Sequence, residues 1–223
     1  APGEWIRIYE YTDHKLSVNS ISWGPHEFGR LCLICGSSDG FISVHTHQEG
    51  STWDVKTFEG HKLGVNSVSW ASPHTPTSLL DASGSQPAHV KRFVTGGCDN
   101  VVRLWQYVEG EEQPWKPQAE LTGHADWVRD VAWAPNIGLP TDTIASCSQD
   151  GTVFIWTCDA NSTEWNRKEL PRKHKDVVWR VSWSVTGNIL AVSGGDNKVS
   201  LWKESLDHEW KAISVLDQES QGL

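Results

Sequence analysis

The stretch GHADWVRDVAWAPNIGLPTDTIASCSQDGTVFIW, residues 123–156, carries the pattern that decides the fold. It opens on Gly-His, and nine residues after His124 comes Trp133, at the end of a run in which apolar and polar residues alternate. A second run ends in turn residues at Asp150, and Trp156 follows six residues later. Alternation with a period of two is typical of a strand with one packed face, so the stretch predicts three short strands joined by tight turns.

The same unit is written four times along the chain. The His and the Trp nine residues later are His14 and Trp23, His61 and Trp70, His124 and Trp133, and His174 and Trp183. The second strand of each unit ends at Asp39, Asp99, Asp150 or Asp196, and a fourth strand carries Trp53, Trp115, Trp165 or Trp210. Repeats of four antiparallel strands that open on Gly-His indicate the blades of a WD-repeat β-propeller.

The repeats predict an all-β chain with four complete four-stranded blades in a single partial propeller domain, residues 1–216. The expected blades cover residues 13–58, 60–120, 123–170 and 173–216, with a C-terminal tail at 217–223. Residues 4–11, EWIRIYEY, carry Trp5 nine residues before His14, the spacing that Trp115 and Trp165 keep to the next His. We therefore expect an orphan outer strand at 4–11, left from a preceding blade, and N-terminal blades that are missing from this chain.

Composition narrows the classes of partner. The formal net charge is -9, and both a nucleic-acid backbone and an anionic membrane reward Lys and Arg, so direct contact with either is not expected. Five cysteines, an odd number, with no secretory signal predict reduced thiols in the cytosol or nucleus. No run approaches the roughly 20 apolar residues of a membrane span, which predicts a soluble chain with only indirect membrane contact. Protein partners, in a hetero-oligomer, are favoured.

A His, a hydroxyl residue, an Asp and a Trp recur together. The sets are His61, Thr95, Asp99 and Trp105; His124, Ser146, Asp150 and Trp156; and His174, Ser193, Asp196 and Trp202. Such residues could form the triad of a propeller hydrolase, but a triad is needed once, and here a Trp always stands where its indole could donate to the hydroxyl. The sequence favours buried structural networks and no enzyme. In the first blade Cys35 replaces the hydroxyl and His45 the Trp, which predicts the weakest network.

No cofactor or metal is expected. Cys32 and Cys35 have the spacing of metal ligands, but three residues apart on a strand they point to opposite faces. His45 and His47 share a face without a second pair of ligands. No Gly-rich loop joins a strand to a helix, so nucleotide binding has no support.

Three runs carry a resemblance to a known family. They are KRFVTGGCDNVVRLW (91–105), DWVRDVAWAPNIGLPTDTIASCSQDGTVFIWT (126–157) and NILAVSGGDNKVSLWKES (188–205). Together with the insertion at 71–92 and the IGLPT loop at 137–141, they resemble the Sec-thirteen family of WD-repeat proteins. The sister Seh-one-like nucleoporins share the same plan, but the insertion and the loop favour the first family.

The resemblance implies a fold and a role. Such proteins form an open six-bladed ring into which a large helical partner inserts a seventh blade, and this chain would match the last four blades. The implied partners are the helical outer-coat subunit of COPII vesicles and a helical nucleoporin of the nuclear-pore Y-complex. The implied role is a non-enzymatic scaffold in ER-to-Golgi transport and at the pore. The implied locations are the cytoplasm at ER exit sites and COPII vesicles, the nuclear pore and, in a nutrient-signalling complex, the lysosome or vacuole surface.

The last blade would form one wall of the cleft that accepts the partner. Residues on its strands are the expected contacts: Trp179, Arg180, Val199, Leu201 and Trp210. An alternative from another class is a WD-repeat adaptor that binds peptides at the centre of the ring. The loops that would serve it offer a mixed set: Lys15, Lys62, Asp126, Trp127, Lys175 and Asp176.

Overall fold

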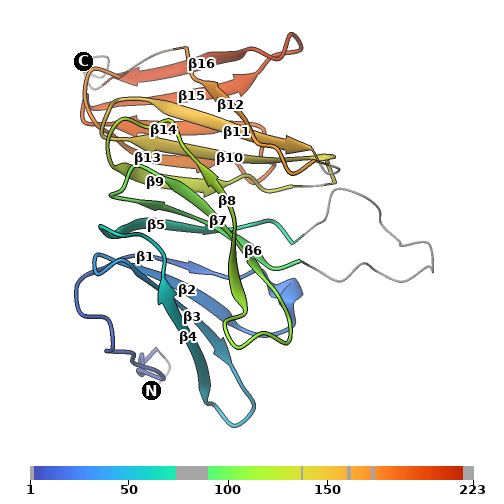
Figure 1. Cartoon of the computed structure of the whole chain (residues 1–223). Helices are drawn as coiled ribbons and strands as arrows, with labels where there is room; N and C mark the ends of the chain where they lie inside the picture. Colours follow the sequence, from blue (N-terminus) through green and yellow to red (C-terminus); the bar gives the residue numbers. More distant parts are fainter. Residues whose placement is uncertain (1–2, 74–89, 137, 160–161, 172–173, 218–223) are drawn as a thin grey trace, which may run out of the picture.

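The computed structural model describes residues 3–73, 90–136, 138–159, 162–171 and 174–217. Apart from one short 3-10 helix, η1 (His26–Phe28), the regular structure of these residues consists of strands. Four consecutive strands pair antiparallel in each of four sheets, in chain order from one edge of the sheet to the other (Figure 1). The prediction of an all-β chain with four four-stranded propeller blades is confirmed. No described helix is long and apolar enough to cross a membrane.

Each blade contains four strands. The first blade contains β1 (Val18–Trp23), β2 (Cys32–Ser37), β3 (Phe41–His47) and β4 (Trp53–Glu59). The second contains β5 (Val65–Trp70), β6 (Arg92–Gly97), β7 (Val102–Tyr107) and β8 (Trp115–Leu121). The third contains β9 (Val128–Trp133), β10 (Thr141–Ser148), β11 (Val153–Asp159) and β12 (Asn166–Glu169). The last contains β13 (Val178–Trp183), β14 (Leu190–Gly194), β15 (Lys198–Glu204) and β16 (Trp210–Asp217).

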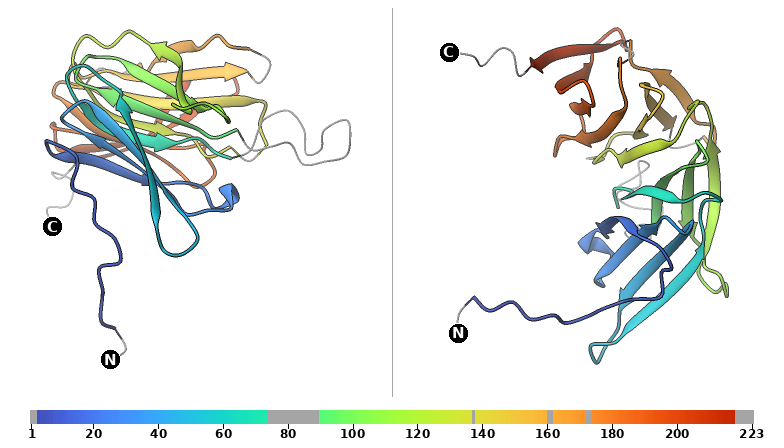
Figure 2. Two further views of the ribbon diagram at one scale, coloured as in Figure 1. Left: turned by 60° about the horizontal axis from the view of Figure 1, so that its bottom comes forward. Right: turned by 90° about the vertical axis from the view of Figure 1, so that its left-hand side faces the viewer.

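The blades stand side by side in an open arc, with the first blade at one end and the last at the other (Figure 2). Their strands cover residues 18–59, 65–121, 128–169 and 178–217. The insertion of the second blade lies largely outside the described residues, because 74–89 are not among them.

The hydrophobic core lies between blades. One cluster joins the first and second blades around Ile34 and Trp70, a second joins the second and third, and a third joins the third and last around Ile155 and Trp202. Burying an aliphatic or aromatic side chain contributes about 1.5–3 kcal/mol relative to leaving it exposed. Each blade is thus stabilised mainly by the blades on either side of it.

A repeated hydrogen bond also joins neighbouring blades. In each of the first three blades, the third residue of the first strand accepts a hydrogen bond from a backbone N–H in the first strand of the next blade. The three bonds run from Val68 N to Ser20 Oγ (3.2 Å), from Val131 N to Ser67 Oγ (3.3 Å) and from Val181 N to Asp130 Oδ2 (3.0 Å). The Ser67 hydroxyl also donates to Asp130 (2.6 Å), so this carboxylate connects three blades. Burial raises the pKa of Asp130, although these hydrogen bonds oppose the effect.

Residues 4–11 form no strand, which corrects the expectation of an orphan outer strand. Trp5 is 98% exposed, and two tyrosines of the segment contact the first blade. The Tyr9 hydroxyl lies 3.0 Å from His45 Nδ1, and Tyr11 lies 3.1 Å from Thr57 Oγ1. A strand needs a hydrogen-bonded neighbour, and none of the described strands pairs with this segment.

Replacing the carboxylate that connects three blades tests this joint. In Asp130→Ala, the Val181 N–H and the Ser67 hydroxyl lose their acceptor, and we expect the free energy of unfolding to fall by about 2–3 kcal/mol. Asp130→Ser, which introduces the residue found at this position in the first two blades, should lose less. Urea unfolding followed by tryptophan fluorescence measures both. Asp54→Ala, on an exposed position of β4, is the control and should stay within about 0.5 kcal/mol of the parent. Equal losses of the free energy of unfolding in Asp130→Ala and Asp54→Ala would contradict a stabilising role for the hydrogen bonds of Asp130 between blades.

Candidate protein-interaction face

The buried network of the second blade is a continuous chain of hydrogen bonds. Trp105 Nε1 donates to Thr95 Oγ1 (3.0 Å), which lies 2.8 Å from His61 Nε2, and His61 Nδ1 lies 2.7 Å from Asp99 Oδ1. Arg103 forms an ion pair with the same carboxylate at 2.6 Å. Burial lowers the pKa of His61 and keeps its ring neutral. Burial acts to raise the pKa of Asp99, but the hydrogen bonds from His61 and Arg103 outweigh it and lower that pKa.

The third blade repeats this chain with one added hydroxyl. Trp156 Nε1 donates to Ser146 Oγ (2.8 Å), which lies 2.8 Å from His124 Nε2. His124 Nδ1 is 3.0 Å from Thr152 Oγ1 and 3.6 Å from Asp150, so Thr152 lies between the ring and the carboxylate. Sequence reasoning missed Thr152, because the equivalent positions of the other blades, Phe41, Val101 and Lys198, carry no hydroxyl.

In the last blade the hydroxyl comes from a different strand than expected. Trp202 Nε1 donates to Ser200 Oγ (2.8 Å) on β15, while His174 Nδ1 lies 3.5 Å from Asp196. The predicted Ser193 is not part of this network, because it stands three residues before the Asp, whereas Thr95 and Ser146 stand four before theirs. On a strand an odd offset points to the opposite face. Val192 occupies the equivalent position and has no hydroxyl.

The first blade shows the same replacement. Cys35 stands four residues before Asp39, and Ser43 on β3 supplies the hydroxyl, 2.8 Å from both His14 Nε2 and His45 Nε2. The first and last blades therefore share one arrangement. In each, a Ser on the third strand stands two residues before the ring that it contacts, which is His45 in the first blade and Trp202 in the last. The sequence carries this signal, a Ser at 43 and 200 in the two blades whose second strand lacks a hydroxyl.

The hydroxyls of the networks cannot serve a hydrolase. Thr95, Ser146 and Ser200 are each 0% exposed, so no substrate carbonyl can approach them. In the second and third blades each hydroxyl accepts from a Trp and has a His ring as its other neighbour, which satisfies its hydrogen bonds within the blade. The arrangement is structural.

The outer face of the last blade is open where the same face of every other blade is covered. In the first three blades, the apolar residues of the third strand that face the next blade are each at most 2% exposed: Ile42 and Val44, Val102 and Leu104, and Val153 and Ile155. At the equivalent positions of β15, Val199 is 39% exposed and Leu201 is partly exposed. We call this surface, with Arg180 on β13 and Leu216 on β16 in register with Val199, the last-blade face.

The five expected partner contacts do not share this face. Val199 and Leu201 lie on it, and Arg180 stands at a position of this face while its side chain also lines a cavity at the inner edge of the arc. Trp179 points instead toward the inner edge of the arc, where its ring lies 4.9 Å from the Arg129 guanidinium. Trp210 is buried, 6% exposed, and packs edge-to-face on Trp183 (ring centroids 5.8 Å apart) in the cluster between the third and last blades. The expectation that Trp210 contacts a partner is therefore corrected.

A second open face lies at the other end of the arc, on the first blade. Val18, Ile21 and Trp23 are 47%, 62% and 57% exposed. Their equivalents in the second and third blades are covered by the preceding blade and at most 7% exposed: Val65, Val68 and Trp70, and Val128, Val131 and Trp133. The described arc thus ends in an apolar sheet face on both sides.

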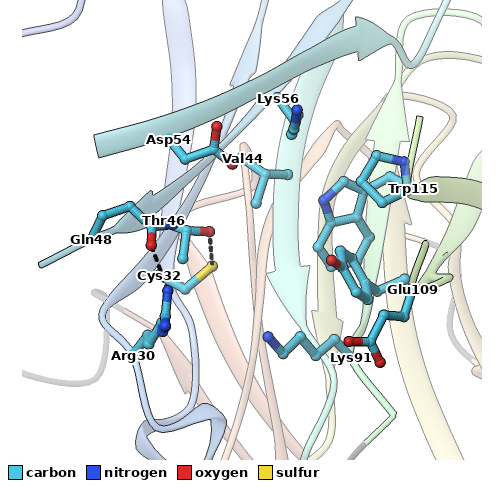
Figure 3. Close-up of a pocket in the computed structure, with 12 residues that line it drawn as sticks. Arg30, Cys32, Val44, Thr46, Gln48, Asp54, Lys56, Lys91, Glu109 and Trp115 are labelled. Atoms are coloured by element: carbon cyan, nitrogen blue, oxygen red, sulfur yellow. Dashed lines mark hydrogen bonds between the residues drawn. The ribbon is translucent and has the colours of Figure 1, made fainter. Parts of the chain in front are cut away.

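Two cavities lie on the surface of the described arc. One, about 500 Å³, lies at the inner edge of the arc, where Arg129 stands between the rings of Trp127 (5.0 Å) and Trp179. The other, about 310 Å³, lies between the outer strands of the first two blades (Figure 3). Lysines and acids share its walls, among them Lys91 and Glu109, so it favours no ligand of one charge.

Comparison with known proteins agrees with the repeat seen in the sequence. The family model of the WD domain, G-beta repeat, matches residues 5–46, 53–106, 115–157 and 167–203. Each match begins at the outer strand of one blade and continues through three strands of the next. The first match thus gives residues 5–11 the place of an outer strand, although they have no sheet to join in the described residues.

Individual relatives are similar over most of the chain. Protein SEC13 homolog of Homo sapiens is 57% identical over 186 residues, 82% of this chain and 57% of that protein. Protein transport protein SEC13 of Mycosarcoma maydis is 45% identical, over 96% of this chain and 65% of its own length. Protein transport protein sec13 of Aspergillus clavatus is 48% identical, over 98% of this chain and 72% of its own length. The chain spans less than two thirds of the first two.

The swapped hydroxyl of the last blade is tested by two alanine substitutions. Ser200→Ala removes the acceptor of the buried Trp202 indole, and we expect the free energy of unfolding to fall by about 1–3 kcal/mol. Ser193→Ala should change it by less than about 0.5 kcal/mol, because Ser193 is only half-buried and accepts no indole. Chemical denaturation of both variants under identical conditions measures the two changes in the free energy of unfolding. The reverse order of losses would restore the arrangement predicted from sequence.

The buried histidines predict a loss of stability in mild acid. Burial, assisted by the neighbouring His14, lowers the pKa of His45 from 6.5 to about 4, and burial also lowers the pKa values of His61 and His124. As the pH falls from 6.5 to about 4, the unfolded chain binds protons that the folded protein does not, so stability is full above 6.5 and declines below it.

Urea unfolding at several pH values across this window measures the effect. His45→Gln should flatten the decline, because one of the groups that binds protons only in the unfolded chain is gone. His26→Gln, at a solvent-exposed ring, is the control and should keep the decline of the parent. A stability that stays constant from pH 6.5 to 4 in the parent protein would refute this account.

Proposed function

Because this chain belongs to the Sec13 family of WD-repeat proteins, we propose that it acts in protein transport as a structural scaffold that catalyses no reaction. Two of the relatives carry protein transport in their names. The buried His, hydroxyl and Asp sets add no chemistry, since each is closed within its blade. The features that remain available for a function are the blades and the surfaces that they present to partners.

The finer part of the proposal concerns the assembly. The protein works in the COPII coat between the endoplasmic reticulum and the Golgi and in the nuclear-pore Y-complex, peripheral to the membrane and in contact with other proteins. A long helical partner completes its ring by donating a blade. The three matched runs and the sequence resemblance support these assignments, and the last-blade face supplies the physical reason for a donated blade.

The last-blade face is the observation on which the proposal rests. The same third-strand positions are sealed in three blades, and at the fourth they are open, so a further sheet would bury them as the next blade does elsewhere. Apolar side chains and a sheet face of this kind favour a stable and largely apolar interface. A sheet is the complementary shape, because each described blade is already covered by a sheet of the same kind.

A second candidate, a peptide-binding adaptor, is favoured by the cavity at the inner edge of the arc. There an arginine is held between two exposed tryptophans, Trp127 at 42% and Trp179 at 47%. Aromatic and arginine side chains in one pocket are typical of protein-binding hot spots. The loop residues considered from sequence gave no such cluster, because Arg129 and Trp179 lie on strands.

Charged substitutions on the last-blade face separate the two candidates. Val199→Asp and Leu201→Asp in the full-length protein would place an unpaired carboxylate in an apolar interface, so we expect recovery of a long helical partner to fall about tenfold or more. Affinity purification from cells with quantitative mass spectrometry measures the recovery, and thermal unfolding verifies the fold. Val108→Asp, similarly exposed but on the turn after β7, is the matched control.

Unchanged recovery in both face variants would contradict blade donation at this surface. If Trp127→Ala then removes partners that the face variants keep, the adaptor is the correct function. Loss of all partners in Val108→Asp as well would show that the substitutions act on folding, and milder replacements, Val199→Thr and Leu201→Thr, would then replace them in the same comparison.

A further inference from the structure

The last blade departs from the others at the position that joins blades. In the first three blades the third residue of the first strand is Ser20, Ser67 or Asp130, and each accepts a hydrogen bond from a backbone N–H of the next blade. In the last blade this position is Arg180. A guanidinium has donors only and cannot accept a hydrogen bond. The repeated joint therefore stops at the last blade.

Arg180 is available to a partner. Its side chain is 72% exposed, and the Asp130 carboxylate, 3.9 Å from the guanidinium, already accepts from Ser67 and Val181. Arg180 is in register with Ser193 and Val199, so it stands on the last-blade face, at the border where its side chain also lines the cavity at the inner edge of the arc. A guanidinium covered without an acceptor would be costly, since buried charges need a hydrogen-bonded partner.

We propose that the blade docked on the last-blade face carries an Asp or Glu whose carboxylate pairs with Arg180. This inference rests on the proposed function and specifies the chemistry of the donated blade. A carboxylate matches both the charge and the planar donor geometry of the guanidinium. The joint with the partner is thus an ion pair, whereas the joints within the chain are made by backbone N–H groups.

Arg180 also disfavours a second copy of this chain as the protein that docks on the last-blade face. The open face of the first blade would bring the N–H of Ile21 to this joint, since Ile21 stands where Val68, Val131 and Val181 stand in the other blades. That donor would meet Arg180, another donor. A mismatch of two donors at this contact opposes end-to-end association of two copies.

Photo-crosslinking identifies what lies against this position. A benzoylphenylalanine is placed at residue 180 and, in a separate protein, at residue 201 of the full-length chain, and the crosslinked peptides are sequenced by mass spectrometry. We expect both positions to capture one partner, and the segment captured from residue 180 to include an Asp or Glu. Capture of a partner at 201 with no acidic residue near the site captured from 180 would overturn this inference alone. No capture at 201 would count against the proposed function itself, and capture of a second copy at both positions would overturn both.

Charge exchange tests the ion pair directly. Arg180→Glu in the full-length protein should lower recovery of the captured partner about tenfold or more, because it opposes two carboxylates at a contact that excludes water. Lys56→Glu, an equal change of charge at an exposed position of β4 in the first blade, should lower it less than about twofold. Replacing the captured acidic residue with Lys in the partner should restore recovery with Arg180→Glu. Full recovery with Arg180→Glu, or improved recovery with Arg180→Ser, would show that the ordinary backbone joint continues here and would overturn the proposal.

Discussion

A propeller blade has two apolar faces, and the structure depends on covering both of them. A four-stranded sheet of this size has too little interior of its own, so its branched and aromatic side chains become buried only when another sheet stacks on them. Val102 and Leu104 show the result, because both are fully buried between the second and third blades. The same requirement applies to the two end blades, and it makes their open faces the most informative surfaces of the molecule.

The polar interior follows from the same stacking. Trp and His rings placed between strands need partners for their N–H groups, and a single hydroxyl can serve both rings from either of two strands. In the second and third blades it comes from the second strand, as Thr95 and Ser146, and in the other two from the third, as Ser43 and Ser200. In every blade the ring of a Trp or His has a hydroxyl partner. This hydroxyl comes from the second strand in two blades and from the third strand in the other two.

The repeats predicted the fold well because blade architecture is encoded in local features, namely alternation, turn residues and tryptophans at fixed offsets. Errors arose where a conclusion needed strand register. Ser193 and Ser200 differ in which face they occupy, and Trp210 was assigned to a surface although its side chain faces the third blade. Residues 4–11 have the spacing of a strand, but a strand depends on a neighbour that spacing cannot supply. The sequence predicts a partner contact at Arg180 only because this residue lies on a strand of the last blade. Its proposed role follows from the residues at the same position in the other three blades.

The proposed function requires that a sheet from another protein cover the last blade. A cryo-electron microscopy structure of the full-length protein, purified from cells with its natural partners, tests this most directly. The account predicts strands of a partner stacked on β13–β16, with Val199 and Leu201 buried beneath them as Val102 and Leu104 are buried within the chain. A last-blade face that is covered by the protein's own blades, or that stays open to solvent in the assembly, would contradict it.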